Sequence, residues 1–300
     1  MTHAFLGRSN FSRYPSLTPT IFMLKSQRQT QVSAEPDPLA ARVRATWTSG
    51  NFGRIARGYE LGAAQFVTRL GLEPGERVLD VATGTGNLAI PAARTGALVT
   101  GVDIAPNLLT QAKARATAEG LTMRLDVGDA EALPYADGEF DTAISMFGAM
   151  FAARPERAAS ELLRGVHAGG RIAMANWTPT SFIGEMLRTT SRYSPPAAGV
   201  PSPLLWGSEQ YVRELLGDGL SALTLTRRII TFEFACDPAG VVNEFIQWYG
   251  PTLRAFASLD ESAKAGLRRE LETLWMDHNR ADDGTTRVQS EYLEVMGVAK

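Results

Sequence analysis

The sequence contains little cysteine and histidine, and these shortages exclude several kinds of site. Cys236 is the only cysteine in 300 residues, so no disulfide can form within the chain and a zinc site built on cysteines is not expected. The histidines are His3, His167 and His278, too few to predict a multi-histidine metal site, and we expect no metal. A chain without disulfides is typical of the reducing cytosol, so we predict a cytoplasmic protein.

Long apolar runs and an excess of one charge are also missing. No run approaches the roughly 18 apolar residues that a membrane-spanning helix needs. Thirty basic and 32 acidic residues leave a net charge of −2, which gives no overall attraction to nucleic acid or to an anionic membrane. We therefore expect no nucleic-acid partner and no membrane span. The hydrophobic share of 44% is that of an ordinary globular chain, and the sequence does not indicate an oligomeric state.

The start of the chain lacks acidic side chains. Residues 1–34 contain no Asp or Glu, but several basic residues stand among many Ser and Thr. This composition predicts a disordered leader, which we extend over residues 1–37, or a start placed too early with Met23 as the true first residue. An organellar transit peptide is the minor alternative. The basic residues are Arg8, Arg13, Lys25 and Arg28.

From about residue 38, strand-like and helical runs alternate. Such alternation predicts βαβ units that build a parallel sheet with helices on both faces. Strands are expected at residues 77–82, 98–104, 123–127, 140–146 and 171–177. Helices are expected at residues 38–46 and 55–70 before the first strand, and at 88–94, 106–119 and 155–166 between the strands.

The last hundred residues follow a different pattern. A short helix is expected at residues 208–216, and helical stretches are expected at 238–256 and 261–279. Two strand-like runs, 223–234 and 287–298, enclose the two later helical stretches. Because the late strands show no helical periodicity, we expect them to form an antiparallel pair at the edge of the sheet, with a helical insertion between them.

A glycine-rich turn follows the first predicted strand. Gly84 and Gly86 allow the backbone to turn sharply and to approach a ligand, and the helix that follows offers unpaired N–H groups. Asp103 ends the next strand, where an acid can accept hydrogen bonds from both hydroxyls of a ribose. The pattern predicts a nucleotide pocket. The spacing from Gly84 to Ala89 also satisfies the dinucleotide fingerprint.

Asp80 favours S-adenosylmethionine over a dinucleotide as the ligand of this pocket. It lies four residues before Gly84, so a pyrophosphate at the turn would meet a like charge. Like charges about 4 Å apart cost on the order of 4 kcal/mol at an effective dielectric constant near 20. S-adenosylmethionine, which carries an amino group and a sulfonium, would instead be attracted. The alternative is that Asp80 only caps a nearby loop through backbone amides.

A second acidic turn follows the third predicted strand. Residues 126–134 read Asp-Val-Gly-Asp-Ala-Glu-Ala-Leu-Pro. Asp129 at the strand exit, followed by the small Ala130, can accept a hydrogen bond from an adenine amino group while the backbone meets the ring edge. The alternative is a plain turn capped by an aspartate.

In combination, these motifs resemble class I S-adenosylmethionine-dependent methyltransferases. The closest group is the bacterial small-molecule one that includes ubiquinone/menaquinone-type methyltransferases, and the resemblance covers residues 47–177. Ala82 stands where the commonest motif has glycine, and residues 145–150 lack the fourth-strand signature of the quinone-type enzymes. The motifs are Asp80-x-x-x-Gly84-x-Gly86, Asp103, the run Gly128–Pro134, and Gly169-Gly170-Arg171.

The resemblance implies S-adenosyl-L-methionine as the cofactor and assigns residues to it. The glycines would lie under the methionine part, Asp80 near its amino group, Asp103 on the ribose, and Asp129 with Ala130 at the adenine. The expected cofactor-binding residues are Asp80, Ala82, Gly84, Gly86, Asp103, Ile104, Asp129, Ala130 and Met146.

The fold class that follows is α/β: a Rossmann-like, doubly wound sheet, mostly parallel, with a C-terminal antiparallel strand pair. A helical N-terminal extension and a helical lid insertion complete it. We expect one methyltransferase domain over residues 38–300, with a cofactor-binding core at 72–177 and the insertion, which would cover the substrate, at about 237–283.

The expected reaction is methyl transfer to a small, fairly apolar metabolite by in-line displacement, which mainly requires alignment. We name no catalytic base. For the apolar substrate candidates, the alternative is ordinary core packing. For the protein as a whole, the alternative functions are an NAD(P)-dependent oxidoreductase and a non-catalytic S-adenosylmethionine-binding module. The substrate candidates are Trp47, Phe52, Phe147, Met150, Phe151, Trp177 and Tyr249.

Overall fold

A computed structural model describes residue 1 and residues 37–300 of the chain. The predicted leader up to residue 36, and with it the alternative start at Met23, lies outside the described residues. A seven-stranded sheet with the strand order β3-β2-β1-β4-β5-β7-β6 forms the centre of the fold. The first five strands run parallel, and β7 pairs antiparallel with both β5 and β6. The strands are β1 (Arg77–Val81), β2 (Leu98–Asp103), β3 (Arg124–Val127), β4 (Phe140–Met146), β5 (Val166–Trp177), β6 (Leu220–Phe234) and β7 (Thr286–Ala299).

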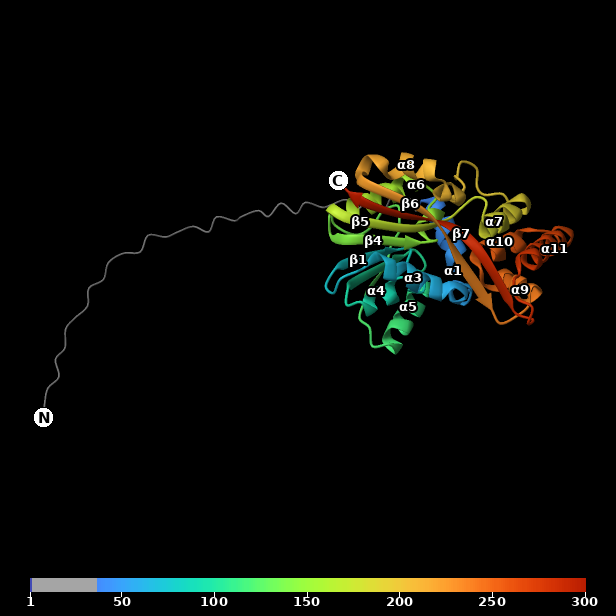
Figure 1. The fold of residues 1–300 in the computed structure, drawn as a ribbon, viewed down its shortest axis with the longest axis horizontal. Coiled ribbons are helices and arrows are strands. Elements are labelled where there is room, and N and C mark those ends of the chain that lie inside the picture. The colour runs from blue at the N-terminus through green and yellow to red at the C-terminus, as the bar shows by residue number, and fades with distance from the viewer. Residues whose placement is uncertain (2–36) are drawn as a thin grey trace. The chain divides into compact units, whose positions relative to one another are not determined.

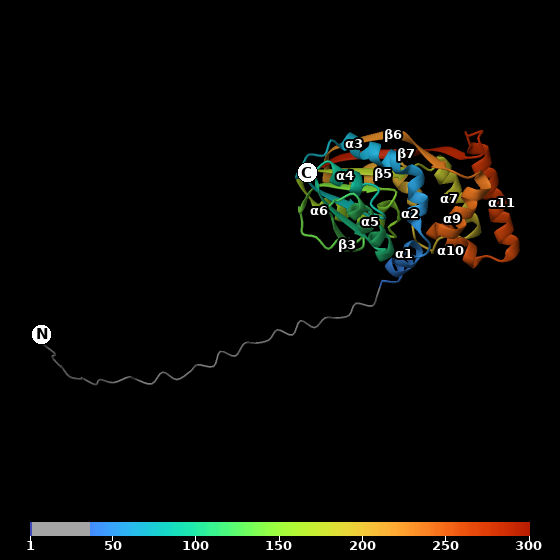
Figure 2. The same cartoon turned by 90° about the horizontal axis from the view of Figure 1, so that it is seen from below.

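Helices cover both faces of the sheet, as the βαβ pattern predicted. Helices α3, α4 and α5 lie on one face and α6 and α8 on the other, while α7, α9, α10 and α11 gather at one end (Figures 1 and 2). The helices are α1 (Pro38–Thr48), α2 (Phe52–Ala56), α3 (Glu60–Leu70), α4 (Ala89–Arg94), α5 (Pro106–Ala118), α6 (Pro155–Gly165), α7 (Phe182–Tyr193), α8 (Glu209–Leu216), α9 (Pro238–Trp248), α10 (Gly250–Ser258) and α11 (Glu261–His278). The Rossmann-like α/β class with a C-terminal antiparallel pair is confirmed.

Three elements differ from the sequence prediction. The helix expected at residues 238–256 breaks at Tyr249, whose backbone is extended at φ −86° and ψ 107°, just before Gly250 and Pro251. The helix expected at 55–70 is interrupted by a short 3-10 turn, η1 (Arg57–Tyr59). Helix α7 was not predicted. Pro251 has no amide hydrogen to donate to the carbonyl of Gln247, and its ring would clash with that carbonyl in a continuous helix, which accounts for the first break.

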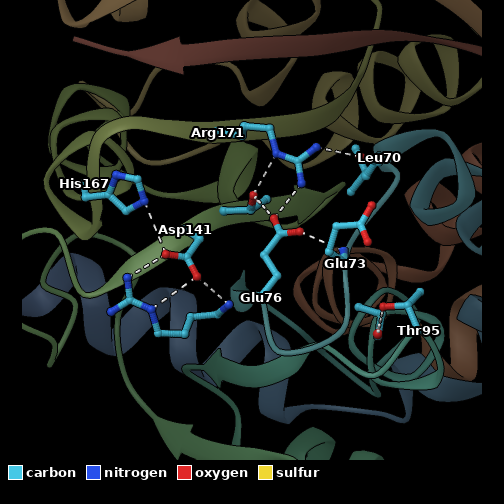
Figure 3. Close-up of polar contacts among 10 residues, drawn as sticks. Leu70, Glu73, Glu76, Thr95, Asp141, His167 and Arg171 are labelled. Carbon is cyan, nitrogen blue, oxygen red and sulfur yellow. Dashed lines mark hydrogen bonds and ion pairs between the residues drawn. The ribbon is translucent and has the colours of Figure 1, made fainter.

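A polar network joins the amino ends of β1, β4 and β5 (Figure 3). Glu76 accepts hydrogen bonds from Thr142, at 2.6 Å, and from the guanidinium of Arg171, at 2.5 Å. Asp141 forms an ion pair with Arg77 at 2.6 Å, and its carboxylate lies 3.2 Å from Nε2 of His167. The strand expected at residues 171–177 begins earlier, at Val166, so His167 lies in β5. Ligands of open α/β sheets bind at the carboxyl ends of the strands. This network lies at the opposite edge of the sheet, which it stabilises.

Candidate active site

The carboxyl ends of the parallel strands open into a large cavity. Its empty volume is about 900 Å³, including the open mouth. The turn after β1, the ends of β2 and β4, and the loop after β3 form its floor, and residues of α1 and α2 form its other wall. The carboxyl ends of the strands are where open α/β sheets bind their ligands.

The turn after β1 has the left-handed backbone that its glycines predicted. Gly84 lies at φ +54°, and a Cβ built there would have no neighbour closer than the ring of Phe52 at 3.9 Å, so this face of the turn is open. Ala82 also lies in the left-handed region, at φ +57°. Gly148 packs against it, because a Cβ at 148 would come within 2.6 Å of the Cβ of Ala82. The alanine in the motif is therefore accommodated by a glycine on the neighbouring strand end.

Two buried carboxylates face this turn. Asp80 accepts hydrogen bonds from Oγ1 of Thr83, at 2.6 Å, and from the amide of Ala89, at 3.1 Å. Asp103 accepts from the amides of Gly84 and Ala105, each at 2.8 Å. Burial raises the pKa of Asp80 to about 7 and that of Asp103 to about 6. Asp80 thus caps the loop, as the alternative reading held, and at the same time lines the cavity.

No Lys or Arg within residues 37–300 forms an ion pair with either carboxylate. Each carboxylate oxygen can still accept a further hydrogen bond, since a carboxylate offers about four lone-pair sites. The site therefore suits a ligand that brings its own positive charge and hydroxyl donors.

The loop after β3 forms the far wall of the cavity. Asp129 accepts a hydrogen bond from the amide of Glu131 at 2.9 Å, and its partial burial raises its pKa. Glu131 is held by Arg154 at 2.8 Å, and the same guanidinium pairs with Asp37, the residue that caps α1, at 2.5 Å. The ion pairs attach α1 to this wall.

A second, smaller cavity adjoins the first, and we call it the aromatic chamber. Its empty volume is about 340 Å³, and none of its lining residues is charged. Five aromatic residues line both cavities: Trp47, Phe52, Tyr59, Phe147 and Phe151. The remaining lining residues of the aromatic chamber are Ile55, Trp177, Ile183, Met186, Phe232, Phe245 and Tyr249.

The structure brings most of the predicted site residues together. Every residue predicted to bind the cofactor lines the large cavity except Gly86, which shapes the turn at φ +84°. Every substrate candidate lines the aromatic chamber except Met150, which is buried in the core with 1% of its surface exposed. His278 lines neither cavity and lies 3.0 Å from the carbonyl of Leu274.

Sequence reasoning missed several residues of the aromatic chamber. Tyr59 follows an expected helix pattern, and Phe232 lies in a strand-like run, so neither stands out in the sequence. Ile183 and Met186 belong to the unpredicted α7. The signal that was available is the aromatic density before β1, in which Tyr59 stands close to Trp47 and Phe52.

Comparisons with known proteins agree with this geometry. A family model described as a methyltransferase domain matches residues 79–174. An uncharacterised protein of Mycobacterium tuberculosis is 39% identical over 262 residues, which cover 86% of this chain and 94% of that protein. The chain belongs to the class I S-adenosylmethionine-dependent methyltransferases.

Two further comparisons cover a shorter stretch of the chain or its fold alone. The demethylmenaquinone methyltransferase of Thermus thermophilus is 42% identical over 106 residues, 35% of this chain and 48% of that protein. The crystal structure of the YcgJ protein of Bacillus subtilis superposes with a TM-score of 0.55 at 15% identity, over 79% of this chain and 97% of that one, and so supports the fold. None of the helices described for residues 37–300 is long and apolar enough to span a membrane.

Proposed function

We propose that this methyltransferase holds S-adenosylmethionine in the large cavity and transfers its methyl group to a small, apolar acceptor in the aromatic chamber. The observation that carries the proposal is the shared wall of the two cavities. Because five aromatic residues line both, a ligand in one cavity lies next to a ligand in the other. In-line displacement needs this adjacency.

The residues around the large cavity fit the cofactor. Asp80 and Asp103 are buried carboxylates without a cationic partner in the described part of the chain, and a cationic amino group or ribose hydroxyls would supply what they lack. The open face of Gly84 leaves room for the methionine part. Asp129 and Ala130 on the far wall would meet the adenine. Ile104 and Met146 would contribute apolar contacts to the same ligand.

The protein's part in the reaction is alignment and exclusion of water. The bound sulfonium supplies an activated methyl group. Trp47, Phe52 and Phe151 would fix the acceptor against the shared wall, and Tyr249 would close the chamber from the helical insertion. Excluding water directs the methyl group to the acceptor. No residue is assigned the role of a base.

Two other functions were considered from the sequence. An NAD(P)-dependent oxidoreductase is disfavoured, because Asp80 would lie at short range from a pyrophosphate. A non-catalytic S-adenosylmethionine-binding module is disfavoured by the second cavity, for which a binding module has no use. The single unpaired Cys236 supports a cytoplasmic location.

The test is transfer of a radiolabelled methyl group from S-adenosylmethionine to a panel of small aromatic metabolites. We expect product from uncharged members of the panel and S-adenosylhomocysteine in equal amount. Reactions without an acceptor serve as the control for slow hydrolysis. Tight cofactor binding with no product from any acceptor would support the binding module instead.

A further inference from the structure

Two tyrosine hydroxyls are the distinctive polar groups of the aromatic chamber. Tyr59 is 6% exposed and Tyr249 is 5% exposed, and both line the chamber. Within residues 37–300, neither hydroxyl forms a hydrogen bond, and neither is among the polar atoms sealed completely from solvent. Both hydroxyls therefore keep some open space beside them; Tyr249 lines the chamber alone, and Tyr59 lines the chamber and the large cavity.

At both positions, phenylalanine would fill the same space without burying a hydroxyl. A hydroxyl buried this deeply without a protein partner gives up most of its hydration and gains no hydrogen bond within the protein. Five of the other chamber residues are phenylalanines, so the packing itself does not require a hydroxyl. A ligand that forms hydrogen bonds with these hydroxyls would account for tyrosine, and not phenylalanine, at these two positions.

The two tyrosines come from different walls. The ring of Tyr59 packs edge-on against Phe147, with ring centroids 5.7 Å apart, and Tyr59 lines the large cavity as well. The ring of Tyr249 packs against Phe245 at 5.3 Å and Trp47 at 5.9 Å. Burial raises the pKa of both hydroxyls, and each adjusts to its surroundings as a neutral donor and acceptor.

The rest of the chamber limits the charge and size of its ligand. None of the lining residues is charged, so an ionised acceptor would lose its hydration without a compensating partner. The empty volume of about 340 Å³ includes the open mouth of the chamber, so only a compact ligand fits inside. Aromatic side chains on most sides favour a ring compound.

We propose that the aromatic chamber binds a compact, uncharged ring compound with one hydroxyl group, and that Tyr59 and Tyr249 select this compound by hydrogen bonds to its hydroxyl. A hydroxyl both donates and accepts, which matches a pair of hydroxyls that do the same. Because Tyr59 lines both cavities, this contact holds the acceptor's polar atom at the shared wall. The inference rests on the proposed function, since it makes the chamber the acceptor site.

The test compares three probes with the same ring: toluene, para-cresol and para-toluate. Calorimetry measures their affinities for the full chain, with and without saturating S-adenosylhomocysteine. We expect para-cresol to bind about tenfold more tightly than toluene, the factor that one ordinary hydrogen bond gives, and para-toluate to bind most weakly. In the double variant Tyr59→Phe/Tyr249→Phe, this preference should fall below about threefold while toluene affinity stays within about twofold.

Controls separate selection by the tyrosines from general effects. Tyr211→Phe removes a hydroxyl from α8, outside both cavities, and should leave the preference unchanged. The single variants Tyr59→Phe and Tyr249→Phe, with melting temperatures near that of the wild type, show that the fold is kept. Equal binding of para-cresol and toluene, tightest binding of para-toluate, or an unchanged preference in the double variant would overturn the inference.

The same experiment distinguishes this inference from the proposed function. Failure of S-adenosylhomocysteine to bind contradicts the proposed function alone, because the preference for para-cresol is also measured without it. Normal binding of S-adenosylhomocysteine without any preference for para-cresol contradicts only the role of the tyrosines.

Discussion

Two buried carboxylates make the large cavity sensitive to pH. Burial raises the pKa of Asp80 to about 7 and that of Asp103 to about 6, from a usual value of 3.8. The folded chain therefore holds protons that the unfolded chain releases above about pH 4. By linkage, the ligand-free fold loses stability as the pH rises from about 4 to about 7. A cationic ligand reverses this effect, since it favours the ionised carboxylates.

Cofactor affinity should therefore increase with pH. Between pH 5.5 and pH 8, we expect the affinity for S-adenosylmethionine to rise on the order of tenfold, because Asp80 must lose its proton before it can pair with the amino group and Asp103 must lose its proton before it can accept from both ribose hydroxyls. Calorimetry at several pH values, in buffers of different ionisation enthalpy, would show the affinity and the released protons. Asp80→Asn should flatten the upper part of the profile. An affinity that is constant over this range in the wild type would remove Asp80 from the amino-group site.

Gly148 and Ala82 pack so closely that a side chain at position 148 would collide with Ala82. A Cβ at position 148 would lie 2.6 Å from the Cβ of Ala82 and 2.9 Å from its carbonyl oxygen. We expect Gly148→Ala to cost about 1–3 kcal/mol of stability, as overpacking does. The double variant Ala82→Gly/Gly148→Ala should recover part of the loss, because it removes the closer contact and the left-handed alanine. Urea unfolding measures both values, and strictly additive effects would contradict the contact.

Among the secondary structure elements, the βα alternation was predicted, but the breaks in the helices were missed, although Pro251 is a helix-breaking signal inside the helix expected at residues 238–256. Alternating runs and terminal glycines gave the strands and their order along the chain. The break at Tyr249 depends on Gly250 and Pro251 together with the close packing of α10 on α1, and tertiary contacts cannot be read from periodicity. The break also shapes the acceptor site, because Tyr249 lies at the break and lines the aromatic chamber. The expected lid over residues 237–283 remains a prediction.

The segment before β1 and the helical insertion meet at two glycines. The amide of Asn51 donates a hydrogen bond to the carbonyl of Trp248 at 3.0 Å, and a Cβ on Gly50 would lie 2.5 Å from the same oxygen. A Cβ on Gly250 would collide with the carbonyl oxygen of Thr46. Since Trp47 and Tyr249 lie beside these contacts, the two segments together close one side of the aromatic chamber.

Separating these segments should affect the acceptor more than the cofactor. We expect Gly250→Ala to lower methyl transfer or to raise the Michaelis constant for the acceptor, because the added methyl group pushes α10 away from α1. Affinity for S-adenosylmethionine should stay within about 1 kcal/mol, since Asp80 and Asp103 lie outside the joint. Gly217→Ala is the matched control, because a Cβ there meets nothing within 4 Å. Equal losses in both variants would contradict a closing role for the joint.

At the scale of the whole molecule, ion pairs join segments that are far apart in the sequence. Arg154 connects Asp37 at the start of α1 with Glu131 in the loop after β3. Glu294 in β7 pairs with Arg69 of α3 at 2.6 Å and with Arg228 of β6 at 2.5 Å. A ligand in the large cavity contacts the sheet and the segment before it together, so its binding energy should appear as stability of the entire fold.

A thermal shift experiment tests this coupling and the nature of the cofactor together. At a concentration near 100 times its dissociation constant, S-adenosylhomocysteine should stabilise the fold by about 2.7 kcal/mol. For a domain of this size, that corresponds to a rise in melting temperature of roughly 5–10 °C. NADH should produce no comparable rise, because its pyrophosphate would approach the carboxylate of Asp80. Asp80→Asn removes this repulsion along with the attraction for the amino group, so the variant should respond less to S-adenosylhomocysteine and no less to NADH than the wild type. Stabilisation of the wild type by NADH to the same degree would contradict the role of Asp80 and return the oxidoreductase to consideration.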